Sequence, residues 1–295
     1  MSARVFCLGV AVQDYVFSLP EMPKLPQKYR ASDFALVGGG CAGNAAVTVA
    51  RLGGNAYLAT RLGADSLADI IIGELEAEGV DCTYAARFEN CRSSISAVLV
   101  DASGERTIVN YRDPALPETT DWLPNFAKLK PGAVLVDTRW PVGAQAALSY
   151  ARTHGIPGIV DAEPPLRPAE KALHTASHIA FSRDGLEDWA KTDDIARGLA
   201  IASADTKAFV CVTDGANGVH YRRGDETGWL PSYPVDAVDT LAAGDVWHGA
   251  FALPLAEGRD ELEAIRFASA AAALKCTRFG GRAAIPHRVQ VESFL

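Results

Sequence analysis

Short apolar segments rich in β-branched residues recur along the chain, and longer segments with helical spacing lie between them. The apolar segments are residues 5–12, 57–60, 133–136, 158–160 and 208–212. Short continuous apolar runs are typical of strands in a parallel sheet, because crossover helices bury both faces of such a sheet. The alternation therefore predicts a three-layer α/β/α sandwich with a mostly parallel central sheet.

Three segments carry clear helix signals. Residues 44–52 form an alanine-rich run, and residues 262–272 repeat apolar side chains at helical spacing. Asp65 or Ser66 can cap a third helix, which we expect to end near Gly79. We expect these helices to cover the faces of the sheet.

One region interrupts the alternation. Residues 93–100 and 106–112 resemble strands, and the turn-forming sequence DASG at 101–104 joins them, so they predict an antiparallel hairpin. Residues 20–34, with three prolines and then a polar strand-like stretch, are expected to join that hairpin. We interpret about 13–36 and 92–113 as a small β lid within a single domain of residues 1–295.

Composition narrows the classes of partner. The 295 residues include 28 Lys and Arg against 36 Asp and Glu, which gives a formal net charge of -8. A broad surface for nucleic-acid phosphates is not expected from that balance. The opening apolar run at 5–12 is too short to cross a bilayer and no cleavage site follows it, so we expect a soluble, cytoplasmic protein with no membrane partner.

Cysteine and histidine give no metal site from the sequence. The six cysteines contain no Cys-x-x-Cys pair and several lie in apolar runs, which favours buried free thiols in a reducing compartment. His174 and His178 are four residues apart, but no third ligand lies near them and the HExxH pattern is absent. The metal ligands, if any, are unknown at this stage.

Residues 38–43, GGGCAG, match the GxGxxG pattern of dinucleotide-binding turns. In that fold the motif follows the first strand directly, whereas here the preceding residues belong to the predicted lid. An NAD-dependent oxidoreductase is therefore kept only as an alternative. Closely spaced glycines also permit a ligand or another backbone to approach closely.

Residues 238–251, VDTLAAGDVWHGAF, place small residues before an acid that opens a predicted helix. Unpaired N–H groups and the positive end of the helix dipole favour an anion at such a position. Asp245 beside a bound phosphate is a candidate general base. The alternative is that Asp245 only stabilises the first helical turn.

Together these two segments resemble the signatures of the PfkB, or ribokinase-like, carbohydrate kinase family. Residues 39–53 resemble the first signature, and DTLAAGD at 239–245 resembles the second, DTxGAGD. The likeness also includes residues 9–14, the TDGANG sequence at 213–218, which is similar to a nucleotide loop, and residues 277–286. It implies an α/β/α core with a small β lid and a phosphotransferase that acts on an alcohol group.

The resemblance implies roles for several groups of residues. Asp245 would deprotonate the attacking sugar hydroxyl, and the backbone N–H groups of Ala242, Ala243, Gly244 and Asp245 would stabilise the transferred phosphoryl group. The expected sugar-binding residues are Asp14, Gly39, Gly40 and Asn44. The expected nucleotide-binding residues are Thr213, Gly215 and Gly218. The resemblance also implies ATP and Mg²⁺, with a monovalent cation such as K⁺ as a further candidate, and a homodimer formed through the lid.

Two positions depart from the family pattern. Ala242 replaces the first glycine of GAGD, and a methyl group is tolerated there without strain only if φ is negative. The NxxE motif, tied to magnesium and phosphate, would fall near residues 181–185, where neither its Asn nor its Glu is present. Asp184 and Glu187 are the candidate substitutes.

Within the family the chain is similar to sulfofructose kinases, at residues 108–111, 137–140, 273–278 and 280–282. In those enzymes a Lys, an Asn and an Arg that match Lys28, Asn110 and Arg139 hold the sulfonate group. The leading hypothesis is an ATP-dependent kinase that phosphorylates a primary hydroxyl of a small ketose, with 6-deoxy-6-sulfofructose as the specific candidate. The alternatives are a kinase for an uncharged sugar such as fructose or ribose, a nucleoside kinase, and a non-catalytic sugar- and nucleotide-binding protein.

Overall fold

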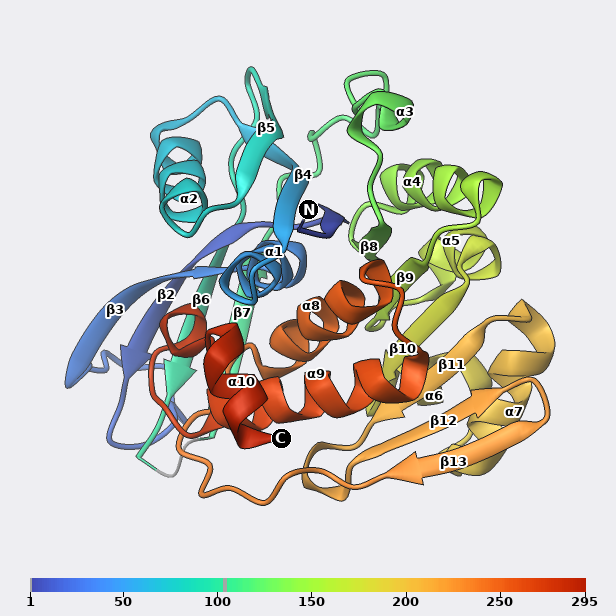
Figure 1. Cartoon of the computed structure of the whole chain (residues 1–295). Coiled ribbons are helices and arrows are strands. Elements are labelled where there is room, and N and C mark those ends of the chain that lie inside the picture. The colour runs from blue at the N-terminus through green and yellow to red at the C-terminus, as the bar shows by residue number, and fades with distance from the viewer. Residues whose placement is uncertain (1, 103–104) are drawn as a thin grey trace.

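The computed structural model describes residues 2–102 and 105–295, and within these residues the strands form two sheets (Figure 1). The large sheet has the strand order β13-β12-β11-β10-β9-β8-β1-β4-β5. Its strands are β1 (Arg4–Leu8), β4 (Asn55–Gly63), β5 (Asp81–Phe88), β8 (Ala133–Asp137), β9 (Gly158–Ala162), β10 (His178–Ser182), β11 (Phe209–Thr213), β12 (Val219–Arg223) and β13 (Glu226–Leu230). All neighbours from β5 to β11 pair in parallel, whereas the β11–β12 and β12–β13 pairs are antiparallel. The predicted mostly parallel sheet is confirmed.

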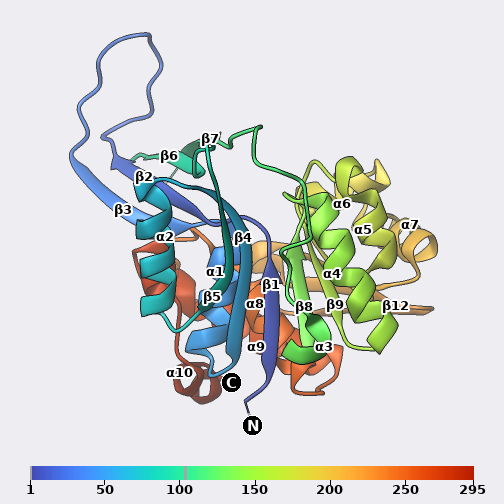
Figure 2. The same cartoon turned by 90° about the horizontal axis from the view of Figure 1, so that it is seen from above.

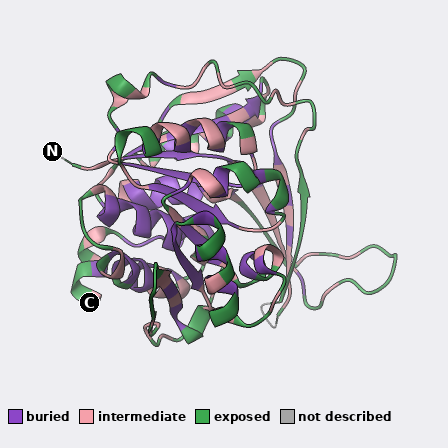
Figure 3. Cartoon of the chain, turned by 90° about the vertical axis from the view of Figure 1, so that its right-hand side faces the viewer, coloured by how far each residue is buried: buried purple, intermediate pink, exposed green. Residues whose placement is uncertain are grey.

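Helices cover both faces of the large sheet (Figures 1 and 2). One face packs against α1 (Cys41–Arg51), α2 (Ser66–Ala77), α8 (Ala243–Ala256), α9 (Glu261–Cys276) and α10 (Arg288–Phe294), and the other against α3 (Phe126–Leu129), α4 (Pro141–His154), α5 (Glu170–Thr175), α6 (Arg183–Ala190) and α7 (Ile195–Thr206). Each face of the sheet has its own hydrophobic core, and alternate residues of β1 point into the two cores. Val5 and Cys7 pack on the face covered by α1 and α8, whereas Phe6 and Leu8 pack on the face covered by α4. The buried residues concentrate between the layers (Figure 3). None of the helices in the described part of the chain is long and apolar enough to cross a bilayer.

The three predicted helices are present as α1, α2 and α9. The predicted cap is present too, because the Asp65 side chain accepts a hydrogen bond from the Ala68 N–H at the start of α2. Asp260 caps α9 in the same way, by accepting from the N–H groups of Leu262 and Glu263. Side-chain caps of this kind satisfy N–H groups that have no partner within the helix.

A second, smaller sheet lies beside the large one, and we call it the small sheet. It contains β2 (Val12–Ser18), β3 (Asp33–Gly39), β6 (Ile95–Val100) and β7 (Arg106–Tyr111) in the order β3-β2-β6-β7. The β6–β7 pair is the predicted antiparallel hairpin, although positions 103 and 104 of its predicted turn lie outside the described residues. The loop at 19–32 extends away from the rest of the molecule (Figure 2), and the strand after it runs to Gly39, beyond the predicted limit of 36.

The prediction of a single strand over residues 5–12 is wrong. β1 ends at Leu8, and β2 begins at Val12 in the other sheet. Glycine is required at the break, since a Cβ atom at Gly9 would lie 2.1 Å from Oδ2 of Asp137. The same carboxylate accepts a hydrogen bond of 2.7 Å from the Val10 N–H. The apolar pattern is continuous across the break, but the chain leaves the large sheet there and enters the small one.

The segment before α8 is held by a buried ion pair. The Lys275 side chain is fully buried, and its Nζ lies 3.0 Å from Oδ2 of Asp239 and donates to the Asp239 carbonyl at 2.8 Å. The Asp239 carboxylate also accepts from the N–H groups of Leu241, Gly280 and Gly281. Burial acts to raise the pKa of Asp239, but these hydrogen bonds and the ammonium group hold it below its ordinary value. The pair therefore fixes both segments that approach the start of α8.

Substituting Lys275→Met leaves the Asp239 carboxylate without its counter-charge. Removing one partner of a buried pair costs about 3–5 kcal/mol, and we expect the free energy of unfolding in urea to fall by about that amount. The matched control is Lys191→Met, because Lys191 is exposed and pairs with Asp188 at 2.9 Å. That variant should lose less than about 1 kcal/mol. Equal losses in the two variants would contradict the anchoring role of Lys275.

Candidate active site

A cavity of about 330 Å³ lies between the small sheet and the main body of the protein. The small sheet contributes Asp14, Ser96 and Asn110 to its lining. The main body contributes Arg139 and the segment at 240–245. The carboxyl ends of β1, β8, β9, β10 and β11 lie at one edge of the large sheet, as the register of Asp137 with Asp161 and of Ser182 with Thr213 shows. Ligands of open α/β sheets collect at this edge.

Asp245 lies in the first turn of α8 and lines the cavity. Its Oδ2 accepts a hydrogen bond of 2.7 Å from Nδ2 of Asn44, which is buried in α1. Burial and the nearby negative charge of Asp161 raise the pKa of Asp245 to about 7, although the bond from Asn44 acts in the opposite direction. A carboxylate with this pKa can accept and release a proton near neutral pH.

The amino end of α8 presents backbone N–H groups to the same cavity. Ala243 donates to the Thr240 carbonyl at 3.2 Å, so its N–H is already engaged. The helix geometry leaves the following N–H groups of Gly244 and Asp245 without an intrahelical acceptor. With the helix dipole, these groups favour an anion beside the Asp245 carboxylate.

Ala242, the residue that departs from the family signature, has φ 63° and ψ 11°. This is the left-handed region, so the condition of a negative φ is not met. A non-glycine residue costs about 1–2 kcal/mol in this conformation. Ala242 therefore has the left-handed backbone conformation that glycine favours, and its methyl group makes this conformation strained.

A buried arginine that the sequence analysis did not identify connects the site residues. Arg282 donates from Nε to Oδ1 of Asn44 and from Nη2 to the Gly39 carbonyl, both at 3.0 Å. Because Asn44 accepts from Arg282 through its oxygen, its amide nitrogen is turned toward Asp245. Arg282 follows a Gly-Gly pair near the end of the chain, and this position alone gave no signal of a catalytic contact.

Of the predicted sugar-binding residues, Asp14, Gly40 and Asn44 line the cavity, and Gly39 packs against the Asp14 side chain. Burial raises the pKa of Asp14, against a hydrogen bond with Ser96 and the charge of Arg282. A Cβ atom on Gly39 would lie 2.1 Å from Oδ2 of Asp14, and one on Gly40 would lie 2.5 Å from the Val10 carbonyl. Glycine is therefore required at both positions by close approach of neighbouring groups.

Next to Asp245 lies a group of acidic and thiol side chains. A carboxylate oxygen of Asp161, one of Asp245 and Sγ of Cys41 lie within 4.8 Å of one another. Nε2 of His248 is 3.1 Å from Oδ1 of Asp161, and both side chains are buried. Burial opposes protonation of His248, but the Asp161 carboxylate raises its pKa. The Asp161 charge also raises the pKa of Glu163, and burial adds to this effect.

Asp161, Glu163 and His248 were not predicted as site residues from the sequence. A signal for Asp161 was present, because it directly follows the predicted strand at 158–160. A polar residue at the carboxyl end of a parallel strand is a candidate site residue. His248 lies three residues after Asp245 in α8, as expected for a neighbour on one helix face, but its partner Asp161 comes from a distant strand.

Two of the three predicted sulfonate-binding residues line the cavity. Nη1 of Arg139 donates to the Pro164 carbonyl at 2.7 Å, and its Nη2 lies 3.6 Å from Oε2 of Glu163. Asn110 donates from Nδ2 to Oγ of Ser96 at 2.8 Å. Lys28 is exposed in the 19–32 loop and is not among the described residues that line this cavity.

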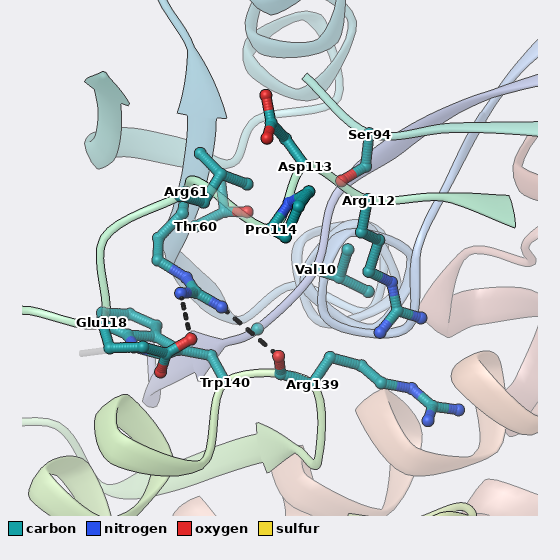
Figure 4. Close-up of a pocket in the computed structure, with 12 residues that line it drawn as sticks. Val10, Thr60, Arg61, Ser94, Arg112, Asp113, Pro114, Glu118, Arg139 and Trp140 are labelled. Carbon is teal, nitrogen blue, oxygen red and sulfur yellow. Dashed lines mark hydrogen bonds and ion pairs between the residues drawn. The ribbon is translucent and has the colours of Figure 1, made fainter. Parts of the chain in front are cut away.

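A second cavity of about 180 Å³ adjoins the first and shares Val10, Arg112 and Arg139 with it (Figure 4). Arg61 fixes one wall by pairing with Glu118 at 2.7 Å and by donating to the Arg139 carbonyl at 3.3 Å. The Arg61 guanidinium also lies over the Trp140 ring, 4.9 Å from its centroid. These contacts hold the loop that carries Arg139.

The residues expected to bind nucleotide lie at the same edge of the large sheet. Thr213 ends β11, and the following turn passes through Gly215 and Gly218, whose φ angles are 53° and 92°. In the described part of the chain these three residues do not line the 330 Å³ cavity. Asp184 and Glu187, the candidate NxxE substitutes, line a separate hollow on α6.

The GxGxxG match lacks the structure of a dinucleotide-binding turn. Gly38 and Gly39 end β3, which pairs antiparallel with β2 in the small sheet. A dinucleotide-binding turn instead follows a strand of the parallel sheet. These glycines therefore serve the junction between the small sheet and α1.

Relatives of known type cover nearly the whole chain. The model of the pfkB family of carbohydrate kinases matches residues 2–288. The chain is 30% identical over 295 residues to a ribokinase of Bacillus subtilis (strain 168), with 99% of each protein covered. It is 27% identical over 293 residues to Fructokinase-1 of Oryza sativa subsp. japonica, with 88% of this chain and 89% of that protein covered.

Solved structures agree with these relatives. A crystal structure from Agrobacterium tumefaciens superposes with a TM-score of 0.94 and 35% identity over 99% of this chain and 97% of that one. Ribokinase from Thermotoga maritima gives a TM-score of 0.86 and 26% identity over 100% and 99%. The structure of Arabidopsis thaliana ribokinase complexed with ribose and ATP shares the fold, with a TM-score of 0.86 and 24% identity over the same shares. The chain therefore belongs to the PfkB family of carbohydrate kinases and is a sugar kinase with the ribokinase-like fold.

Proposed function

We propose that this sugar kinase transfers the γ-phosphoryl group of ATP to a primary hydroxyl of a small ketose, with Asp245 as the general base. The observation that carries the proposal is the Asp245 carboxylate, which lines the cavity at the amino end of α8 with a pKa of about 7. A base needs a pKa near the working pH, and the transferred group needs hydrogen-bond donors beside it.

The reaction can be followed through the residues of the cavity. Asp14 and Asn44 orient the sugar so that the reacting hydroxyl faces Asp245. The hydroxyl oxygen forms a bond to the γ-phosphorus, the bond to the bridging oxygen of ADP breaks, and the hydroxyl proton passes to the Asp245 carboxylate. The N–H groups of Gly244 and Asp245 stabilise the negative charge on the transferred phosphoryl group.

We place the nucleotide along the turn from Thr213 to Gly218, at the carboxyl edge of the large sheet. Mg²⁺ bound to the ATP phosphates would neutralise their charge during transfer. Asp161 and Glu163 supply hard oxygen donors near Asp245, and Oδ1 of Asp161 is paired with Nε2 of His248 at 3.1 Å. These two carboxylates fit Mg²⁺, whereas the nearby Cys41 thiol does not suit this cation.

We propose an anionic ketose, with 6-deoxy-6-sulfofructose as the specific candidate, because Arg139 lines the sugar cavity and its guanidinium is held in place. The Pro164 carbonyl and Glu163 fix the group, and Asn110 adds an amide donor nearby. Since Lys28 is exposed in the 19–32 loop, the proposal rests on Arg139 and Asn110 alone. The neutral alternatives, fructose and ribose, are supported by the names of the relatives.

We also propose a homodimer formed through the small sheet. Phe34, Leu36 and Val109 are large apolar side chains on one face of this sheet, and each is 49% exposed or more. A second copy of the chain would cover them, as an apolar surface of this kind favours association. Sedimentation of the purified protein measures the oligomeric state directly.

The first test is ADP release with a panel of acceptors: fructose, ribose, adenosine and 6-deoxy-6-sulfofructose. We expect the sulfonated ketose to give the highest kcat/KM. In Arg139→Gln, loss of a charge-assisted hydrogen bond should raise KM for this acceptor about tenfold or more and change KM for fructose far less. Equal losses would contradict the anion site, and no ADP release with any acceptor would contradict the kinase proposal.

The second test is the pH dependence of kcat/KM between pH 5 and pH 9. The pKa of Asp245 in the free protein is raised from 3.8 to about 7, so the carboxyl group is protonated below that pH. Only the ionised form accepts a proton, and kcat/KM should therefore rise with pH and level off above about 7. A profile that stays flat down to pH 5 would contradict the assignment of Asp245 as the base.

A further inference from the structure

Arg112 is a second cation of the sugar cavity. It directly follows β7 of the small sheet, and with Arg139 it lines both the 330 Å³ and the 180 Å³ cavities. Arg139 follows β8 of the large sheet. Figure 4 shows the two side chains extending from different segments toward the same side of the smaller cavity. The two guanidinium groups therefore face one region from opposite parts of the molecule.

Neither arginine is neutralised completely by the protein. Arg139 has Glu163 at 3.6 Å, and its buried Nε has no hydrogen-bond partner among residues 2–102 and 105–295. For Arg112, no described side chain lies within salt-bridge distance. Burial and the positive charge of Arg139 lower the pKa of Arg112. Two cations at such a place repel each other unless an anion lies between them.

The carboxylates of Asp137 and Asp113 do not form an ion pair with Arg112. Asp137 attracts Arg112 from a distance, but its oxygens already accept from the backbone N–H groups of Val10 and Arg139. Asp113, the next residue in the chain, accepts from the N–H groups of Arg92 and Ala115 instead. The cation pair is therefore open toward the cavity.

We propose that Arg112 and Arg139 together form a clamp for the anionic group of the sugar, and that Arg112 is a specificity-determining residue. This inference rests on the proposed kinase function and names a second residue for the same substrate site. Guanidinium groups bind sulfonate, carboxylate or phosphate oxygens through paired N–H donors. Two of them on different segments hold such a group from both sides.

The clamp also couples substrate charge to the position of the small sheet. Arg112 directly follows β7 of the small sheet, whereas Arg139 is fixed to the main body through Pro164 and Arg61. An anion between them draws the small sheet toward Asp245, and a neutral sugar leaves the repulsion in place. Loss of Arg112 is therefore expected to lower kcat as well as raise KM for an anionic acceptor, because the approach of the small sheet to Asp245 positions the reacting groups.

The test compares Arg112→Gln, Arg112→Lys and Arg139→Gln with the unmodified protein, using 6-deoxy-6-sulfofructose, fructose 6-phosphate and fructose. We expect Arg112→Gln to reduce kcat/KM for the anionic acceptors that the protein uses by about tenfold or more, as for a lost charge-assisted hydrogen bond. The value of kcat/KM for fructose should change by less than about threefold. Arg112→Lys should recover only part of the loss, because lysine restores the positive charge but not the bidentate hydrogen bonding of arginine. Arg152→Gln on α4 is the matched control, since Arg152 is exposed and carries the same charge.

The outcomes separate the two proposals. If Arg139→Gln loses selectivity for the anion and Arg112→Gln does not, the clamp is overturned while the proposed function stands. If both variants lower kcat/KM for fructose and for the anionic sugars equally, the arginines do not distinguish charged from neutral substrates, and the clamp is also overturned. If the unmodified protein prefers fructose, the anionic acceptor itself is overturned. Selective loss in both variants, with the Arg152→Gln control unchanged, supports the clamp.

Discussion

The site depends on a half-buried carboxylate at the amino end of a helix. Asp245 keeps one fixed hydrogen bond, from Asn44; burial and the charges of Asp161 and Glu163 raise its pKa, whereas the Asn44 bond and the charge of His248 lower it. Desolvation disfavours the charged form of a carboxyl group, which turns an ordinary acid into a base that works near neutral pH. The N–H groups of the same helical turn meet the phosphoryl group, so a single turn of α8 supplies both functions.

Opposite charges around Asp245 keep this arrangement balanced. On one side, Arg282 fixes the Asn44 amide and lies near the half-buried Asp14. On the other side, His248 pairs with Asp161 and carries a raised pKa. A buried charge is tolerated when it is paired or hydrogen-bonded, and each of these groups comes from a different element of the fold. The carboxylates can thus lie close together without unfolding the site.

Much of the fold could be predicted from the sequence, because strands buried on both faces leave a strong apolar signal. β8, β9 and β11 appear where the pattern placed them. The pattern failed at residues 5–12, where one apolar run passes from one sheet to the other at Gly9 and Val10, beside the Asp137 carboxylate. The strand β5 lies at an edge of the sheet and is only partly buried, so its side chains gave a weak signal.

Site residues could be predicted where their neighbours in the sequence indicated a functional position. Asp245 follows small residues at a helix start, and Arg139 follows a buried strand, so both could be proposed from their sequence context. Arg282, His248 and Arg112 could not, because their partners are distant in the sequence and only the folded chain brings them together. The conformation of Ala242 was equally hidden, since a left-handed φ at alanine runs against its local preference.

The central claim is that the Asp245 carboxylate takes the proton of the acceptor hydroxyl. The most direct measurement is kcat of Asp245→Asn beside the dissociation constant of the sugar for the same variant. The amide keeps the size of the side chain but cannot act as a base, so kcat should fall by about 10²–10⁴ while sugar binding changes little. A variant that retains near-normal kcat would contradict the claim.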